Sequence, residues 1–129
     1  MPRTERLDRV LAGGTGLLPR RIRLADGTVL SVQAGPGAWC RPRPALYGTG
    51  NAPADYAGPY THIEVFLVTQ VPVPETWAPY DDGEQRHFGA VPADLVRAFV
   101  DEHGGEHEEQ DLQDDAVKAL AEAFHPARS

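Results

Sequence analysis

The longest apolar, β-branched and aromatic run of the chain extends from Tyr60 to Gln70, with apolar residues at every second position from Ile63 to Leu67. This segment is rich in β-branched and aromatic residues and lies between Gly58-Pro59 and Val71-Pro72, so it predicts a long β-strand. Successive side chains of a strand point to opposite faces. One face is therefore apolar and predicts a core contact, whereas the other is polar at one end, where a functional site has room. The apolar face comprises Ile63, Val65 and Leu67, and the mixed face comprises His62, Glu64, Phe66 and Val68.

A second alternating pattern predicts a β-hairpin. Strands at 20–24 and 28–34 flank the turn sequence Ala25-Asp26-Gly27. A two-residue Asp-Gly loop and a three-residue loop with Gly27 at positive φ both suit this turn. The three-residue loop is preferred because it pairs Ile22 with Leu30 and collects the apolar residues of both strands on one face. That face comprises Ile22, Leu24, Leu30 and Val32.

Three segments have the apolar spacing of amphipathic helices. The first is Thr4 to Ala12, with Thr4 as its N-cap and Gly13-Gly14 at its end. The second begins at Pro92, which suits a first helical position, and stops at Gly104-Gly105. The third occupies the C-terminal region. The apolar positions are Leu7, Val10 and Leu11, then Leu95, Val96, Phe99 and Val100, and finally Leu112, Ala116, Val117, Leu120, Ala121 and Phe124.

These elements predict one α+β domain over residues 1–129, with an acidic C-terminal helical extension at about 106–129. The sheet is expected to be small and mostly antiparallel, with four to five strands including a short one at 86–91. Two to three helices are expected on one side of it. The connections at 45–59 and 72–85 show neither pattern, and loops of this length in a compact domain are often functional.

Charge is unevenly distributed along the chain. Residues 1–43 hold eight arginines and three acidic residues, a net charge of +5, whereas residues 44–129 carry a net charge of −12. The overall charge of −7 makes general nucleic-acid binding unfavourable. With a single cysteine and no apolar run of about 18 residues, we expect no intramolecular disulfide, no membrane span and a cytoplasmic location.

Two arginines suggest a site for a small anion. Arg41 and Arg43 alternate on a segment that is kept extended by the proline after each of them. Guanidinium groups bind phosphate or carboxylate through two parallel hydrogen bonds, and the rings of Trp39 and Tyr47 offer stacking surfaces. The alternative is that the arginines pair with acidic residues of the chain such as Glu64 or Asp81. The candidate ligand-binding residues are therefore Trp39, Arg41, Arg43 and Tyr47.

Candidates for catalysis are fewer. His62 and Glu64 share one face of the central strand and are the candidate acid–base pair. Cys40 needs a histidine within hydrogen-bond reach to act as a nucleophile, and its neighbour Trp39 favours a core role instead. The order His103-Gly104-Gly105-Glu106-His107 matches that of inverted zinc proteases, but its two glycines break the helix that such a site needs. No metal site and no cofactor are expected.

Several short segments resemble a family of small, uncharacterised proteins encoded by phages and prophages. The chain departs from that family's pattern at Trp39, where the family has a tyrosine, and at 66–69, where the family has a Gly-Phe-Pro-Ser-like step. The resemblance implies a phage or mobile-element accessory protein and carries no activity with it. The matching segments are Leu24-Ala25-Asp26-Gly27, Ser31-Val32-Gln33-Ala34, Cys40-Arg41-Pro42-Arg43, Gly58-Pro59-Tyr60-Thr61, Ile63-Glu64-Val65, Val91-Pro92 and His103-Gly104-Gly105.

The function expected from these features is a non-enzymatic interaction or small anionic-ligand-binding module. Its expected partner is a host protein or a small anion, with nucleic acid disfavoured and no membrane involved. The alternative is a small enzyme in which His62 and Glu64 act as acid and base on a nucleotide-like or carboxylate substrate. The sequence leaves the oligomeric state open.

Overall fold

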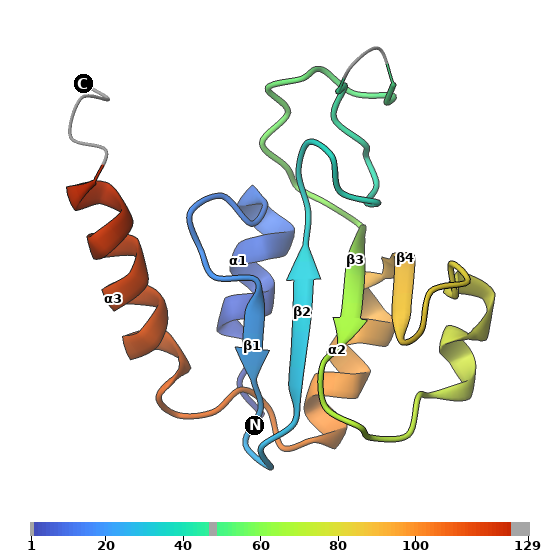
Figure 1. Cartoon of the computed structure of the whole chain (residues 1–129), viewed down its shortest axis with the longest axis vertical. Coiled ribbons are helices and arrows are strands. Elements are labelled where there is room, and N and C mark those ends of the chain that lie inside the picture. The colour runs from blue at the N-terminus through green and yellow to red at the C-terminus, as the bar shows by residue number, and fades with distance from the viewer. Residues whose placement is uncertain (1, 47–48, 125–129) are drawn as a thin grey trace.

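A four-stranded antiparallel sheet in the order β1-β2-β3-β4 forms the centre of the computed structural model (Figure 1). The structure describes residues 2–46 and 49–124, and it confirms the expected α+β fold. The elements in chain order are α1 (Glu5–Gly13), β1 (Arg21–Arg23), β2 (Val29–Gln33), β3 (His62–Leu67), the 3₁₀ helix η1 (Glu75–Tyr80), β4 (His87–Pro92), α2 (Ala93–Glu102) and α3 (Gln110–Ala123).

One face of the sheet is covered and the other is open. Helices α1 and α2 lie together behind the sheet in Figure 1, and the apolar residues of all four strands point towards them. In the part of the chain that the structure describes, no helix covers the opposite face, which carries His62, Glu64 and Phe66. The core is formed by Leu7, Val10, Leu11, Ile22, Leu24, Leu30, Val32, Ile63, Val65, Leu67, Trp77, Phe88, Val91, Val96, Phe99 and Val100, among others.

The hairpin between β1 and β2 has the predicted register. Ile22 lies opposite Leu30, and the N–H of Leu24 donates to the carbonyl of Thr28 at 2.8 Å. Gly27 adopts a φ of 91°, a conformation that costs glycine little because it has no Cβ. The three-residue loop is therefore confirmed, and the alternation of apolar residues was sufficient to select it.

The central strand is shorter than predicted. β3 ends where its neighbours stop pairing with it, because a strand needs a hydrogen-bonding partner on at least one side. Before the strand, the N–H of Tyr60 donates to the carbonyl of Leu11 at 2.7 Å, so this residue is tied to α1 and not to the sheet. The predicted apolar face is confirmed, since Ile63, Val65 and Leu67 are all buried.

Two helical features differ from the predictions. The side chain of Thr4 does not cap α1. Instead, the buried carboxylate of Glu106 accepts hydrogen bonds from the N–H groups of Arg6 at 2.8 Å and Leu7 at 2.9 Å, which satisfies donors of the first turn. The stretch 72–85, predicted to be irregular, contains η1, which places Trp77 in the core.

Helix α3 lies beside the β1 edge of the sheet and its second half extends away from it (Figure 1). Its first turns are integrated into the domain through the buried side chains of Gln110 and Asp114. The predicted apolar positions are exposed, because α3 has no facing element that covers them among the described residues. They include Leu112, Val117, Leu120 and Phe124.

None of the helices in the described part of the chain has the length and apolar character that a membrane crossing requires.

Candidate functional site

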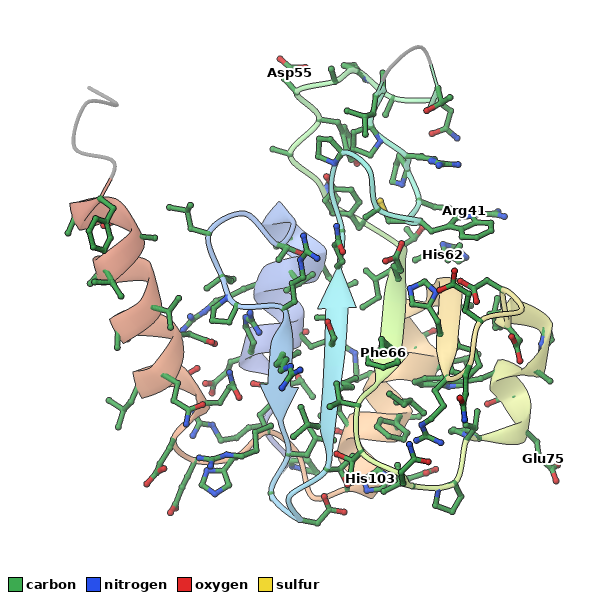
Figure 2. All side chains as sticks on the ribbon, in the orientation of Figure 1. Arg41, Asp55, His62, Phe66, Glu75 and His103 are labelled. Carbon is green, nitrogen blue, oxygen red and sulfur yellow. The ribbon has the colours of Figure 1, made fainter. Side chains whose placement is uncertain are left out.

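A cleft of about 410 Å³ lies at one end of the open sheet face. It is bounded by residues 39–41, by the start of β3, by the bulged part of β4 and by the segment that follows η1. Figure 2 shows Arg41 and His62 close together at this end of the sheet, with Phe66 further along the same face. The lining residues are Trp39, Arg41, His62, Pro79, Tyr80, Asp81, Asp82, Gly89 and Ala90.

Trp39 is held rigidly in the wall of the cleft. Its backbone N–H donates to Glu64 Oε1 at 2.8 Å, and its backbone carbonyl accepts from the N–H of Ala90 at 2.8 Å. A β-bulge opposite Glu64, at which Ala90 has a φ of 50°, turns that N–H out of the sheet ladder. The indole packs on Gly89, where a Cβ would lie 2.7 Å from the ring. Trp39 nevertheless stays 48% exposed, so it presents a fixed aromatic surface.

Arg41 supplies the positive charge of the cleft. Its N–H donates to the carbonyl of His62 at 3.0 Å, which joins its extended segment to the start of β3. Its side chain is exposed and makes no hydrogen bond or ion pair with any described residue. The acidic partners considered from the sequence are engaged elsewhere, since Glu64 binds Trp39 and His87, and Asp81 accepts from the N–H of Gly83 at 2.8 Å.

Of the other two predicted ligand-binding residues, one lies away from this cleft and one is outside the described residues. Arg43 is absent from its lining, and its N–H donates to Asn51 Oδ1 at 2.8 Å. Tyr47 lies outside the described residues. The structure thus brings together Trp39, Arg41 and His62, three of the residues singled out from the sequence.

A hydrogen-bonded row of Glu64, His87 and Asp82 runs beside the cleft. His87 Nε2 lies 3.3 Å from Glu64 Oε2, and His87 Nδ1 is hydrogen-bonded to Asp82 Oδ2. Burial lowers the pKa of His87, but the hydrogen bonds and charges of Asp82 and Glu64 outweigh it and raise that pKa above its ordinary value. Both ring nitrogens of His87 are thus engaged by carboxylates of the protein, so His87 supports the wall of the cleft and is not directed at a ligand within it. No local sequence pattern indicated this row, beyond the presence of the three residue types.

His62 is in a different electrostatic state. Its Nδ1 lies 2.7 Å from Thr61 Oγ1, and no hydrogen bond joins it to Glu64 among the described residues. Burial, and then the charge of Arg41, lower the pKa of His62 below its ordinary value. At neutral pH His62 is therefore an uncharged imidazole next to the guanidinium, and the candidate acid–base pair of His62 and Glu64 is not joined.

This lowered pKa predicts a pH-dependent stability difference. The unfolded chain binds a proton at His62 more readily than the folded chain does. The free energy of unfolding therefore decreases as the pH falls below about 6.5. We expect the stability of the wild type relative to His62→Gln to decrease as the pH falls through that window. Urea unfolding of both proteins between pH 7.5 and pH 5 measures it. Arg41→Ala should reduce the slope, and a difference independent of pH would contradict the assignment.

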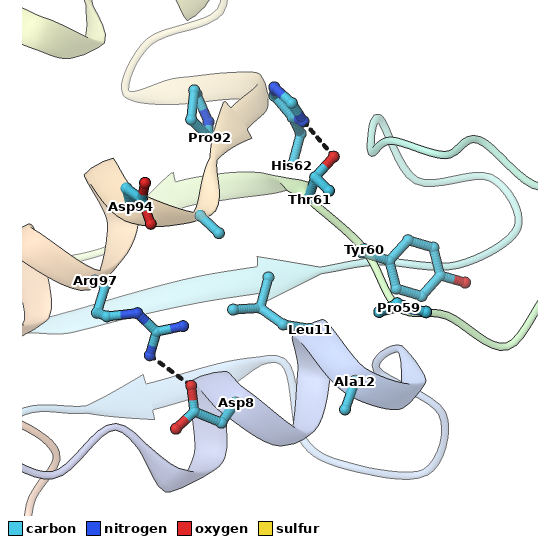
Figure 3. A pocket seen from close by; sticks show the side chains of 11 residues that line it. Asp8, Leu11, Ala12, Pro59, Tyr60, Thr61, His62, Pro92, Asp94 and Arg97 are labelled. Carbon is cyan, nitrogen blue, oxygen red and sulfur yellow. Dashed lines mark hydrogen bonds and ion pairs between the residues drawn. The ribbon is translucent and has the colours of Figure 1, made fainter.

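A second, larger cavity of about 580 Å³ lies between α1 and the start of α2 (Figure 3). Leu11, Pro59 and other apolar groups supply most of its walls. Its charged pair, Arg97 and Asp8, is internally satisfied, with Arg97 Nη1 2.5 Å from Asp8 Oδ1. The cavity therefore offers an apolar surface whose arginine is already paired and whose lining holds a further carboxylate, Asp94, so it is a weaker candidate for an anion than the cleft at Arg41.

The remaining sequence candidates have structural partners. Cys40 is buried, its Sγ contacts the carbonyls of Gly35 and Pro42, and burial raises its pKa, as suits a core thiol. His103 binds Asp26 at 2.6 Å, whereas His107 lies 3.1 Å from the guanidinium of Arg23. His103, His107 and Glu106 of the zinc-protease-like pattern therefore have three different partners, Asp26, Arg23 and α1.

The fold and the cleft define an α+β protein with one open sheet face and a small polar site at its end. No family model, curated protein or solved structure matches the chain. Function is therefore inferred from the geometry of the site.

Proposed function

We propose that this chain is a non-enzymatic binding module of the phage or prophage type, whose cleft takes a small anion that carries a planar ring. The main supporting observation is the exposed guanidinium of Arg41, which has no partner among the described residues, beside the fixed, half-exposed indole of Trp39. A guanidinium recognises phosphate or carboxylate by a forked pair of hydrogen bonds, and an indole offers a stacking surface for a ring.

The opposite wall of the cleft refines the ligand class. Asp81 and Asp82 lie there, and although His87 compensates Asp82, this wall disfavours a second negative charge. Carboxylates accept hydrogen bonds from N–H and O–H donors. A ligand with an anionic group at one end and donor groups on its ring, as in a nucleotide, matches both walls.

Catalysis is less well supported by the same geometry. Glu64 accepts from the N–H of Trp39 through one oxygen and contacts His87 through the other. Both nitrogens of His87 are engaged as well. These groups hold the cleft in shape, so the arrangement favours binding over proton transfer. Docking on a host protein, the other partner class expected from the sequence, stays a prediction, for which the exposed apolar residues of α3 offer a surface.

The binding proposal predicts separable effects of two variants. Arg41→Ala should weaken adenosine monophosphate about 10- to 100-fold, the cost of losing a charge-assisted contact. Trp39→Ala should weaken the nucleotide by a similar factor but leave the weaker binding of inorganic phosphate unchanged, because phosphate has no ring to stack. Isothermal titration calorimetry or chemical-shift titration with both probes and with benzoate measures these affinities.

Arg21→Ala is the matched control, because Arg21 is an exposed arginine on the open face at the far edge strand β1. It should leave the affinity unchanged. Equal binding by the wild type, Arg41→Ala and Trp39→Ala would overturn the proposal, as would a wild type that binds none of the three probes.

A further inference from the structure

Three metal-ligating side chains come together on the turn that leads into β4. One carboxylate oxygen of Asp82, one of Glu84 and a ring nitrogen of His87 all lie within 4.8 Å of one another. Zinc binds nitrogen and carboxylate oxygen at about 2.0–2.2 Å, so ligands of one tetrahedral ion are about 3.3–3.6 Å apart. One ion would therefore draw the three ligand atoms closer together, and the side chain of Glu84 is exposed.

The backbone of the turn holds the ligands in place. The N–H of Glu84 donates to Asp82 Oδ1 at 2.9 Å, and the N–H of His87 donates to the carbonyl of Glu84 at 3.2 Å. Gly83 between them has a φ of 89°, which suits glycine and lets the chain reverse within a few residues. The three side chains therefore converge because of the local fold, and their convergence does not depend on the rest of the surface.

The orientation of His87 is the observation that sets this group apart from a cluster of surface carboxylates. Glu64 Oε2 lies 3.3 Å from His87 Nε2, and the two side chains are only 21% and 22% exposed. Glu64 is itself fixed by the N–H of Trp39. With Nε2 next to this carboxylate, the other ring nitrogen, Nδ1, faces Asp82. Metal-binding histidines in proteins are oriented by a carboxylate on the far nitrogen in the same way.

We propose that Asp82, Glu84 and His87 bind a divalent metal ion of the zinc class, with Glu64 as the outer partner that orients the histidine. Binding replaces the proton on His87 Nδ1, which now faces Asp82 Oδ2, and releases that proton to solvent. Two carboxylates neutralise the ion, and water completes a fourth position. The imidazole nitrogen selects zinc-class ions over magnesium and calcium, which prefer six or more oxygen ligands.

This inference is independent of the ligand proposed for the cleft, although the two sites adjoin. Asp82 lines the cleft, so a cation held by Asp82 and Glu84 neutralises the negative charge that Asp82 contributes to the cleft wall. The pattern Asp-x-Glu-x-x-His escaped the sequence reasoning because it lacks the paired histidines or cysteines of common zinc motifs, and because Glu64 joins it only in the folded chain.

Calorimetry with zinc chloride alone, on the full chain at pH 7.5, tests the proposal. We expect one zinc ion per chain, a rise in Tm, weaker binding at pH 6, and at least 10-fold weaker binding of magnesium and calcium. Glu84→Gln should weaken zinc at least 10-fold without loss of stability, since Glu84 is exposed. Glu64→Gln should weaken it about 10- to 100-fold, the usual effect of removing an outer partner. His87→Ala should abolish stoichiometric binding.

Glu75→Gln is the matched control, because Glu75 is an exposed carboxylate in the same connection between β3 and β4. It should bind zinc as the wild type does. Zinc binding that is unaffected by both Glu84→Gln and His87→Ala would place the ion elsewhere and overturn the proposal. Equal affinity for zinc and magnesium, or no saturable binding by the wild type, would also overturn it.

Discussion

Replacing Trp77 with alanine is expected to lower the free energy of unfolding by about 3–5 kcal/mol, the usual cost of removing a buried tryptophan. Trp77 is completely buried, and its ring centroid lies 5.2 Å from those of Phe88 and Phe99. It joins η1, β4 and α2 at the edge of the core, so truncation leaves a cavity that three elements line. Small domains have a free energy of unfolding of only about 5–15 kcal/mol, so this loss is a large fraction of the total stability.

Urea unfolding followed by far-ultraviolet circular dichroism measures this effect. Trp39→Ala is the matched control, since it removes the same side chain from a half-exposed position, and it should cost about 1 kcal/mol or less. Trp77→Ala should therefore lose mainly stability, whereas Trp39→Ala should lose mainly nucleotide binding. A Trp77→Ala protein with wild-type stability would show that this tryptophan is not packed in the core.

The buried charge pair beneath α3 is the second place where a substitution is expected to change the stability strongly. Arg6 and Asp114 are both fully buried, with Nε 3.4 Å from Oδ2. This is ion-pair distance without hydrogen-bond geometry, and the guanidinium nitrogens have no hydrogen-bond partner among the described residues. Burial lowers the pKa of Arg6 and raises the pKa of Asp114 from their ordinary values. Each charge therefore depends on the other for compensation.

Arg6→Met is expected to destabilise the fold by about 3–5 kcal/mol, because it leaves the Asp114 carboxylate buried without its cation. The double variant Arg6→Met with Asp114→Leu should recover most of that loss, since well-packed apolar residues often replace a buried pair without cost. A double-mutant cycle by urea unfolding measures the coupling. Arg9→Met is the control on the same helix, and as an exposed position it should change stability by about 0.5 kcal/mol.

If the loss in the double variant equals the sum of the losses in Arg6→Met and in Asp114→Leu, the two charges are not coupled and the contact does not contribute to stability. If Arg6→Met costs no more than Arg9→Met, the arginine is hydrated in solution and not enclosed. The pair also connects α1 to α3, so a cooperative loss of α3 helicity in Arg6→Met would show that the C-terminal helix depends on it.

The candidate cleft was visible in the sequence only in part. Trp39, Arg41 and His62 were recognisable as chemistry-bearing residues near rigid backbone, and the structure brings them together. Arg43 was chosen on the same argument, but it does not line the cleft, and its backbone N–H donates to Asn51 Oδ1. No local sequence pattern indicated the roles of Asp82 and His87. Their hydrogen-bonded row is completed by Glu64, which lies on another strand.

Local patterns of residues were enough to predict most elements and the face that each one buries. Side-chain periodicity and turn residues, which act over a few positions, account for the register of the β1–β2 hairpin, for helices α1 and α2 and for the apolar side of β3. Contacts between residues far apart in the chain became apparent only in the folded structure. Glu106 caps α1 from 100 residues away, and Glu64 orients His87 from the neighbouring strand. Such contacts are fixed by how the elements close on one another, which no local pattern encodes.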